Sequence, residues 1–322
     1  MSPSKWLMVL ASSAVLVLGV AACGDGGGDT TGGGGNLSGT INIDGSSTVF
    51  PLTQAAAEGF QGENPDIKIT VGESGTGGGF EKFCAGETDI SDASRPIEPE
   101  EIAICRKNGI SYEEVQVAND GLSVVTNPDL EIKCLSTEQL KQLWNKGSKV
   151  DNYSQLGKDP DTGQALPDAS VSLYGAGTDS GTFDFFTEEI NGEEGASRSD
   201  YQPSEDDNVL VEGVAGDKDG LAYFGFSYYE QNSDKLNLVA VDGGGGCVAP
   251  SVETVQSGEY KPLSRPLFIY PSGEALKSKP EVKAFVQYYL DNYDTIADTA
   301  QLVPMTSGQA SKADATFGKV AG

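Results

Sequence analysis

Residues 45–51 read Gly45-Ser46-Ser47-Thr48-Val49-Phe50-Pro51, and this stretch decides the interpretation of the chain. It follows a strand-like run at 41–44 and precedes a helix-like run at 52–60. A hydroxyl-rich turn at the start of a helix offers free backbone N–H groups and side-chain donors to an anion. The turn therefore predicts an anion site where a strand passes into a helix.

Two further donor-rich turns follow the same order of strand, turn and helix. Glu73-Ser74-Gly75-Thr76-Gly77-Gly78-Gly79 comes after the strand-like run 67–71, and Thr178-Asp179-Ser180-Gly181-Thr182 separates the strand-like run 171–174 from the helix-like run 183–189. In open α/β sheets, ligands bind beyond the carboxyl ends of the strands. We therefore expect βα units around mostly parallel sheets, with the three turns enclosing one anion.

The composition of the chain excludes several classes of function. It contains no histidine, which rules out a Ser-His-Asp triad, a Cys-His pair and a histidine-containing zinc site. No Gly-x-x-x-x-Gly-Lys-Ser/Thr motif is present, so the chain is not expected to hydrolyse ATP itself. A formal charge of −27 argues against nucleic acid as a partner. An anion site must therefore depend on local donors, each contributing roughly 1.5 to 3 kcal/mol to a charged ligand.

The N-terminus has the pattern of an export signal. Lys5 precedes an apolar run at 6–20, which is short for a membrane span, and the run ends in Val20-Ala21-Ala22-Cys23. This ending resembles a bacterial lipoprotein signal, which implies a signal peptide at 1–22 and lipidation of Cys23; an ordinary cleaved signal is the alternative. Residues 23–36 are rich in Gly, Asp and Thr, as in a flexible tether.

The remaining periodic segments predict further helices and strands, and residues 243–246 predict a turn rather than a ligand loop. The predicted helices are 98–107, 137–145 and 280–293, and the predicted strands are 122–126, 236–241 and 267–270.

Seven segments, in this order and spacing, carry a resemblance that spans nearly the whole body of the chain. They are Gly45–Pro51, Ser74–Phe80, Asp89–Ile97, Gly177–Phe183, Asp207–Val211, Gly220–Gly225 and Pro262–Leu267. With them the chain resembles the substrate-binding lipoprotein of the bacterial phosphate ABC transporter. The resemblance implies an α/β, two-lobed, periplasmic-binding-protein-like fold with a hinge and an anion cleft between the lobes. Lobe one would comprise 37–119 plus 262–322, and lobe two 120–261.

The resemblance also implies a function. The protein would bind inorganic phosphate at the extracytoplasmic face of the cell membrane, anchored through Cys23, and deliver it to the permease subunits of the ABC transporter. It would be neither an enzyme nor dependent on a cofactor or metal. The implied phosphate ligands from the three turns are Ser47, Thr48 and Val49, then Ser74 and Thr76, then Ser180, Gly181 and Thr182. For each hydroxyl, the alternative is a helix cap without a ligand.

A charge partner and a proton acceptor complete the implied site. Arg95 is the candidate charge partner, because a guanidinium fork matches two oxyanion oxygens; the alternative is a surface arginine paired with a carboxylate. One branch of the family has an acid at the place of Arg95 and an arginine before the third turn, where this chain has Ala176 and Gly177. Asp179 is the candidate acid that accepts the proton of hydrogen phosphate and so rejects sulfate; the alternative is an aspartate that only caps its own turn.

Cys84, Cys105, Cys134 and Cys247 remain after Cys23 is set aside. An even number of cysteines in an exported chain favours two disulfides, and four cysteines allow three connectivities. Because each pair falls within one implied lobe, Cys84–Cys105 and Cys134–Cys247 are preferred. A metal site is the rival interpretation, although the chain has no Cys-x-x-Cys spacing.

Three other classes of function stay open. A binding protein for another oxyanion, such as sulfate or molybdate, would use the same donors without the inward acid. A phosphate-ester hydrolase of the usual kind would need a histidine base, and this chain has no histidine. In a surface adhesin or structural lipoprotein, the donor turns would be helix caps alone.

Overall fold

The computed structural model of the protein describes residues 37–321, and strands and helices alternate along them. The predicted signal peptide, the tether and Cys23 lie outside the described residues. The strands are β1 (Gly39–Gly45), β2 (Ile67–Val71), β3 (Ile90–Ala93), β4 (Val115–Thr126), β5 (Cys134–Ser136), β6 (Ser172–Ala176), β7 (Gln202–Ser204), β8 (Gly220–Gly225), β9 (Asn237–Asp242), β10 (Cys247–Val248) and β11 (Ser264–Pro271).

Most of the helices follow a strand directly, as βα units require. They are α1 (Phe50–Glu63), α2 (Gly75–Ala85), α3 (Pro99–Lys107), α4 (Thr137–Trp144), α5 (Gly181–Phe186), α6 (Asp207–Gly216), α7 (Phe226–Gln231), α8 (Val252–Ser257), α9 (Gly273–Ser278), α10 (Pro280–Asp291), α11 (Tyr293–Thr299) and α12 (Ser307–Ala321), with a 3-10 helix at Tyr153–Leu156 and a π-helical turn at Thr187–Asn191.

The strands form one curled, mixed sheet rather than the mostly parallel sheets that the sequence predicted. Along its main path the strand order is β2-β1-β3-β11-β4-β8-β6-β7. Five of the ten strand pairings are parallel and five are antiparallel. The antiparallel pairings involve β4, β11 and the β9–β10 hairpin. The expectation was wrong here because strand direction is set by these long-range pairings, which local periodicity does not encode.

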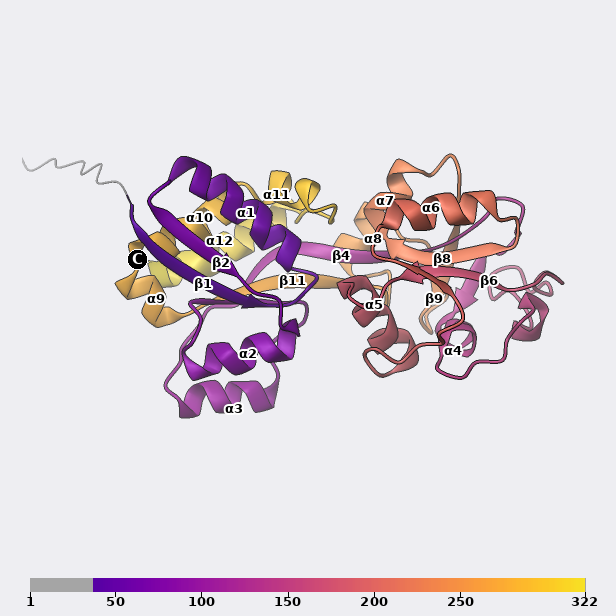
Figure 1. The fold of residues 1–322 in the computed structure, drawn as a ribbon, viewed down its shortest axis with the longest axis horizontal. Coiled ribbons are helices and arrows are strands. Elements are labelled where there is room, and N and C mark those ends of the chain that lie inside the picture. The colour runs from indigo at the N-terminus through magenta and orange to yellow at the C-terminus, as the bar shows by residue number, and fades with distance from the viewer. Residues whose placement is uncertain (1–36, 322) are drawn as a thin grey trace, which may run out of the picture. The chain divides into compact units, whose positions relative to one another are not determined.

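The long strand β4 belongs to two groups of strands (Figure 1). Its first part pairs with β11 as far as Gly121, and from Leu122 onward it pairs with β8 and β9. Asp120 and Arg265 are direct partners at this change of neighbours. β4 and β11 therefore bring residues far apart in the sequence to the middle of the sheet.

The hydrophobic interior consists of separate clusters on the two sides of this change. One of the two main clusters draws on residues between Ile41 and Ala118 and between Leu267 and Phe317. The second draws on residues between Leu122 and Leu263, with Val303 added. Trp144, the last residue of α4, is fully buried in the second cluster and packs against Tyr223.

Local sequence signals account for several element boundaries. Ser136 caps α4 by accepting a hydrogen bond from the Gln139 N–H, and the Gln139 side chain accepts from the Ser136 N–H in return. The predicted turn at 243–246 is confirmed, because the N–H groups of Gly244 and Gly246 both donate to Asp242 Oδ1. Such short-range chemistry needs no information from distant residues.

Two disulfides are present, with the preferred connectivity. Cys84 bonds to Cys105, which joins α2 to α3, and Cys134 bonds to Cys247, which joins β5 to β10. Among the described residues, no group of three or more acidic or cysteine side chains could hold a metal ion. None of the helices in residues 37–321 is long and apolar enough to cross a bilayer.

Asp92 on β3 is a fully buried carboxyl beneath the first donor turn. Neither of its oxygens has a hydrogen-bond partner among the described residues. Burial, opposed by the nearby Thr53 hydroxyl and reinforced slightly by Asp44, raises the pKa of Asp92 to about 8. Because an unfolded aspartate has a pKa of about 3.9, the folded state holds the Asp92 proton over the range between the two values, and stability falls as the pH rises through that range.

The substitution Asp92→Asn should therefore stabilise the protein at neutral and alkaline pH. The gain in melting temperature over the natural protein is expected to grow from about pH 4 to about pH 8 and then level off. Thermal unfolding of both proteins between pH 4 and 9 measures this gain, with Asp129→Asn at an exposed site as the control. A gain that does not change with pH would show that Asp92 is not protonated in the folded protein.

Candidate functional site

One cavity of about 330 Å³ gathers residues from two of the predicted turns and one residue of the third. Its lining residues are Ser46, Ser47, Thr48, Ser74, Gly75, Thr76, Gly77, Gly78, Ser94, Arg95, Glu98, Gly181, Asp184, Phe185, Glu188, Glu194 and Arg265. Elements from both main hydrophobic clusters thus contribute to one enclosed polar space.

The first turn places three residues, Ser46, Ser47 and Thr48, in the wall of this cavity and buries a fourth, Val49. The Ser46 N–H donates to the Asp92 carbonyl at 3.0 Å, which ties the turn to β3. The Val49 N–H donates to the Ser46 carbonyl at 3.2 Å, and the Val49 side chain is fully buried. Ser47 and Thr48 line the cavity, whereas Val49 does not. The predicted ligand role of Val49 therefore has no support in the geometry.

The second turn lies at the N-terminus of α2, whose first residues line the cavity. Free N–H groups and the positive end of the helix dipole favour an anion at such a place. The Ser74 hydroxyl donates to Asp44, which also accepts from Lys82 Nζ at 2.6 Å. The Ser74 oxygen is thus left as an acceptor, not the donor that the sequence predicted. Thr76 Oγ1 accepts from the Ser94 N–H at 3.2 Å.

The third turn reaches the first turn closely at Gly181. A Cβ atom on Gly181 would lie 2.6 Å from Thr48 Oγ1 and 2.7 Å from Ser47 Oγ, so only glycine fits this contact. Ser180 caps α5 by accepting from the Thr182 N–H at 3.2 Å. Ser180 and Thr182 line a smaller neighbouring cavity of about 160 Å³, which shares Ser47, Thr48 and Gly181 with the larger one.

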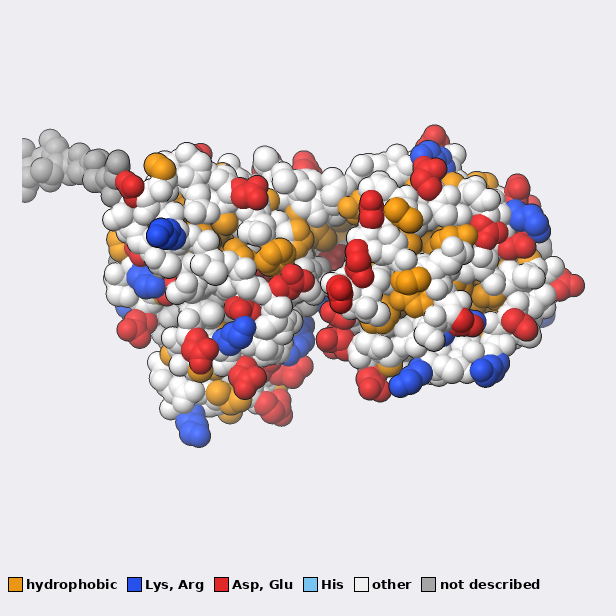
Figure 2. Space-filling model, viewed as in Figure 1, with side chains coloured by type: hydrophobic (Ala, Val, Ile, Leu, Met, Phe, Trp, Pro, Cys, Tyr) orange, Lys and Arg blue, Asp and Glu red, His pale blue; other side chains and the backbone are white. Residues whose placement is uncertain are grey.

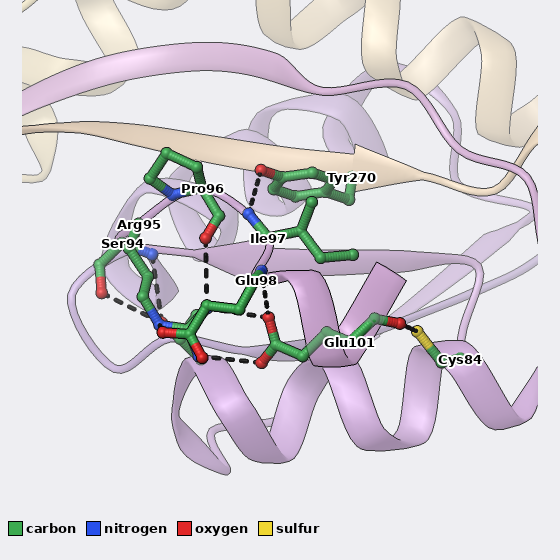
Figure 3. A network of polar contacts seen from close by, with 9 residues as sticks. Cys84, Ser94, Arg95, Pro96, Ile97, Glu98, Glu101 and Tyr270 are labelled. Atoms are coloured by element: carbon green, nitrogen blue, oxygen red, sulfur yellow. Dashed lines mark hydrogen bonds and ion pairs between the residues drawn. The ribbon is translucent and has the colours of Figure 1, made fainter. Parts of the chain in front are cut away.

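Arg95 lines the larger cavity, but its guanidinium is engaged by carboxylates (Figure 3). Its Nη1 and Nη2 atoms each donate to one oxygen of Glu101 at 2.9 Å, and Nε lies 3.4 Å from Glu98 Oε1. Nη1 also donates to the Pro96 carbonyl. This geometry matches the alternative given for Arg95, an arginine paired with acids, better than a free charge partner for an anion.

Arg265 is the cationic residue that the sequence reasoning missed. Only 13% of its side-chain surface is exposed, and Nη2 donates to Thr48 Oγ1 at 3.0 Å. The guanidinium lies 3.6 Å from the centre of the Phe185 ring and contacts Asp120 through Nε at 3.3 Å. The available signal was a charged residue at the start of an otherwise apolar strand, within a segment that already carried the family resemblance.

The acids of the site differ from the predicted one. The Asp179 side chain is exposed and lines neither cavity, while the Asp179 N–H donates to Glu205 Oε1 at 3.3 Å. Asp184, on the first turn of α5, is a half-buried carboxyl in the wall of the larger cavity. Burial, together with Glu194 and Glu188 and against the effect of Arg265, raises the pKa of Asp184 to about 6.

The fold and this cavity define a class of anion-binding receptor, and comparison with known proteins places the chain in a family. Residues 30–292 match the model of the PBP superfamily domain, and the chain belongs to this superfamily.

Relatives within the superfamily cover almost the whole chain. Protein SphX of Synechocystis is 41% identical over 95% of this chain and 88% of its own length. The phosphate-binding protein PstS of Staphylococcus saprophyticus is 37% identical over 98% of this chain and 96% of its own length. A crystal structure of a possible phosphate binding protein from Planctomyces limnophilus superposes with a TM-score of 0.82 at 43% identity, covering 89% of this chain and all of that one.

Proposed function

We propose that this protein binds inorganic phosphate outside the cytoplasmic membrane and delivers it to the permease subunits of an ABC importer. The observation that carries the proposal is the convergence of Ser47, Thr48, the start of α2 and Arg265 on one cavity. The relatives named as phosphate-binding proteins support the same substrate.

Local donors make an anion site feasible in so acidic a protein. Acidic side chains are spread over the whole face seen in Figure 2, in keeping with the net charge of −27. Salt screens exposed charges beyond roughly 8 to 10 Å, whereas hydrogen bonds within a cavity act at contact distance. The proposed phosphate ligands are Ser47, Thr48, Thr76, Gly181 and Arg265, with Arg95, Ser180 and Thr182 at the edge of the set.

The donors of the proposed site come from two lobes. The proposed boundaries are 37–119 plus 262–322 for lobe one and 120–261 for lobe two, and the separate hydrophobic clusters support them. An anion that contacts Thr48 and Gly181 together bridges the lobes and so favours the closed arrangement, because an open one offers only part of the donor set.

The location of the protein follows from its N-terminal sequence. We place it at the outer face of the cell membrane, held by a lipid on Cys23, with residues 24–36 as the tether. Labelling of cells with a radioactive fatty acid tests this placement. Label should enter the natural protein and be lost in Cys23→Ser.

Titration calorimetry on residues 37–322, freed of ligand by unfolding and refolding, tests the substrate at about pH 7.5. Tight one-to-one binding of phosphate with a weak response to sulfate is the expected result. Equal binding of both ions would point to a receptor for another oxyanion. The absence of binding to either would favour a structural lipoprotein.

Asp184 is proposed as the acid that distinguishes phosphate from sulfate. Hydrogen phosphate can donate its proton to this carboxylate, whereas sulfate presents only an unprotonated oxygen and leaves the acceptor unpaired. Asp184→Asn is therefore expected to lower the phosphate-to-sulfate affinity ratio at least tenfold. The matched control is Asp179→Asn, for which calorimetry should find an unchanged ratio. If Asp179→Asn lowered this ratio and Asp184→Asn did not, the proton-accepting acid would be Asp179.

A further inference from the structure

Asp120 and Arg265 form a buried ion pair where β4 and β11 change neighbours. They are register partners on the two strands, and their side chains are 4% and 13% exposed. Burial raises the pKa of Asp120 and lowers the pKa of Arg265, so burial opposes both charges. A pair of this kind adds little net stability compared with apolar residues of the same size, although removing one partner alone is costly.

The geometry of this pair differs from that of the Arg198–Asp200 pair, which lines neither of the two cavities described above. Arg198 donates to Asp200 through both Nε, at 2.6 Å, and Nη2, at 2.9 Å. Arg265 contacts Asp120 through Nε alone, at 3.3 Å. Its Nη2 atom is directed to Thr48, and no hydrogen bond joins Nη1 to any described residue. Nε and Nη2 share one edge of a guanidinium, as the Arg198 pair shows, so Asp120 and Thr48 together hold that edge of Arg265 and leave Nη1 without a partner among the described residues.

The remaining contacts of Arg265 fix the plane of the guanidinium but leave its rotation within that plane undetermined. The Phe185 ring covers one face of the group at 3.6 Å. A flat stacking contact of this kind tolerates rotation of the group over the ring. The Asp120 carboxylate opposes such rotation, because it binds Nε on the same edge of the guanidinium as the Nη2 atom that donates to Thr48.

We propose that Asp120 is a positioning residue for anion binding, which holds Arg265 by Nε so that Nη1 is left available to the ligand. This proposal rests on the proposed function, because it assumes that the larger cavity takes an anion. Asp120 does not line the larger cavity but the smaller neighbouring one, so its carboxylate would act on an anion in the larger cavity through Arg265.

A double-mutant cycle read by titration calorimetry with inorganic phosphate tests the proposal. Asp120→Ala is expected to weaken binding 10- to 100-fold in the natural background and to have no further effect in an Arg265→Gln background. Asp120→Asn should stay within about threefold of the natural affinity, because its amide oxygen can still accept from Nε. Asp200→Ala, which breaks the Arg198–Asp200 pair, is the control and should leave the affinity unchanged.

Two results would overturn the proposal. One is an unchanged affinity in Asp120→Ala, and the other is an equal loss from Asp120→Ala in both backgrounds. If Asp120→Ala does not fold, Asp120→Leu replaces it, since leucine fills the space without accepting a hydrogen bond. Natural affinity in the leucine variant would likewise refute the role. Failure of the natural protein to bind phosphate would instead refute the proposed function.

Discussion

Replacing Arg265 with glutamine is expected to lower phosphate affinity about 10- to 100-fold or more. The substitution removes the guanidinium that contacts Thr48 and Phe185 within the cavity, and a charged hydrogen bond contributes roughly 1.5 to 3 kcal/mol. The phosphate affinity of Arg265→Lys should lie between those of the natural protein and Arg265→Gln, because lysine keeps the charge but lacks the planar guanidinium. Calorimetric titration with phosphate measures all three.

The matched comparison for this prediction is Arg95→Gln. Glu101 binds both terminal nitrogens of Arg95, so Arg95 has little left to offer a ligand. Loss of the Arg95 guanidinium should therefore reduce the phosphate affinity only a few-fold. Thermal unfolding of each variant separates loss of binding from loss of the fold, since Arg265→Gln leaves Asp120 buried without its partner. If Arg95→Gln costs more affinity than Arg265→Gln, the charge partner is Arg95, as the sequence alone suggested.

Gly181→Ala is the second change with a large expected effect. The new methyl group would lie 2.6 Å from Thr48 Oγ1 and 2.8 Å from the Thr48 nitrogen, well inside van der Waals contact. The third turn must then withdraw by roughly an ångström. In enzymes, misplacement of a group on that scale can lower the reaction rate about 100-fold. We expect phosphate affinity to fall at least tenfold, as measured by calorimetry.

The fold itself should tolerate this change. Gly181 is the first residue of α5, and alanine is the better helix former there. Gly216→Ala, at the end of α6, is the control, because a Cβ there meets nothing within 4 Å. Natural affinity in Gly181→Ala would mean that the first and third turns do not approach each other in the binding state.

Much of the local structure could be predicted from the sequence. The strand 67–71 was predicted with its observed bounds, and the helix at 137–145 was predicted to within one residue. The location of the donor turns was also predictable, because glycine and hydroxyl residues mark the passage from a strand to a helix. These features depend on residues within a few positions of each other, where periodicity and capping chemistry suffice.

The role of each polar side chain could not be predicted in the same way. Arg95 and Arg265 are both arginines that follow or begin a strand, yet one is bound by Glu101 and the other is directed to Thr48. The Ser74 hydroxyl was expected to donate to an anion, but it donates its hydrogen bond to Asp44, 30 residues earlier. Asp179 lies in a donor turn, yet its exposed side chain lines neither cavity.

The sequence by itself determined that this is an α/β chain with donor turns at strand ends, without histidine, and with four cysteines after Cys23. The tertiary structure decided which donors share a cavity and which arginine remains available there. It also decided that strands β4 and β11 pair antiparallel. The physical reason is range: the conformation of a turn follows from its own residues, whereas hydrogen-bond partners and burial depend on residues that the fold brings together from as far apart as Thr48 and Arg265.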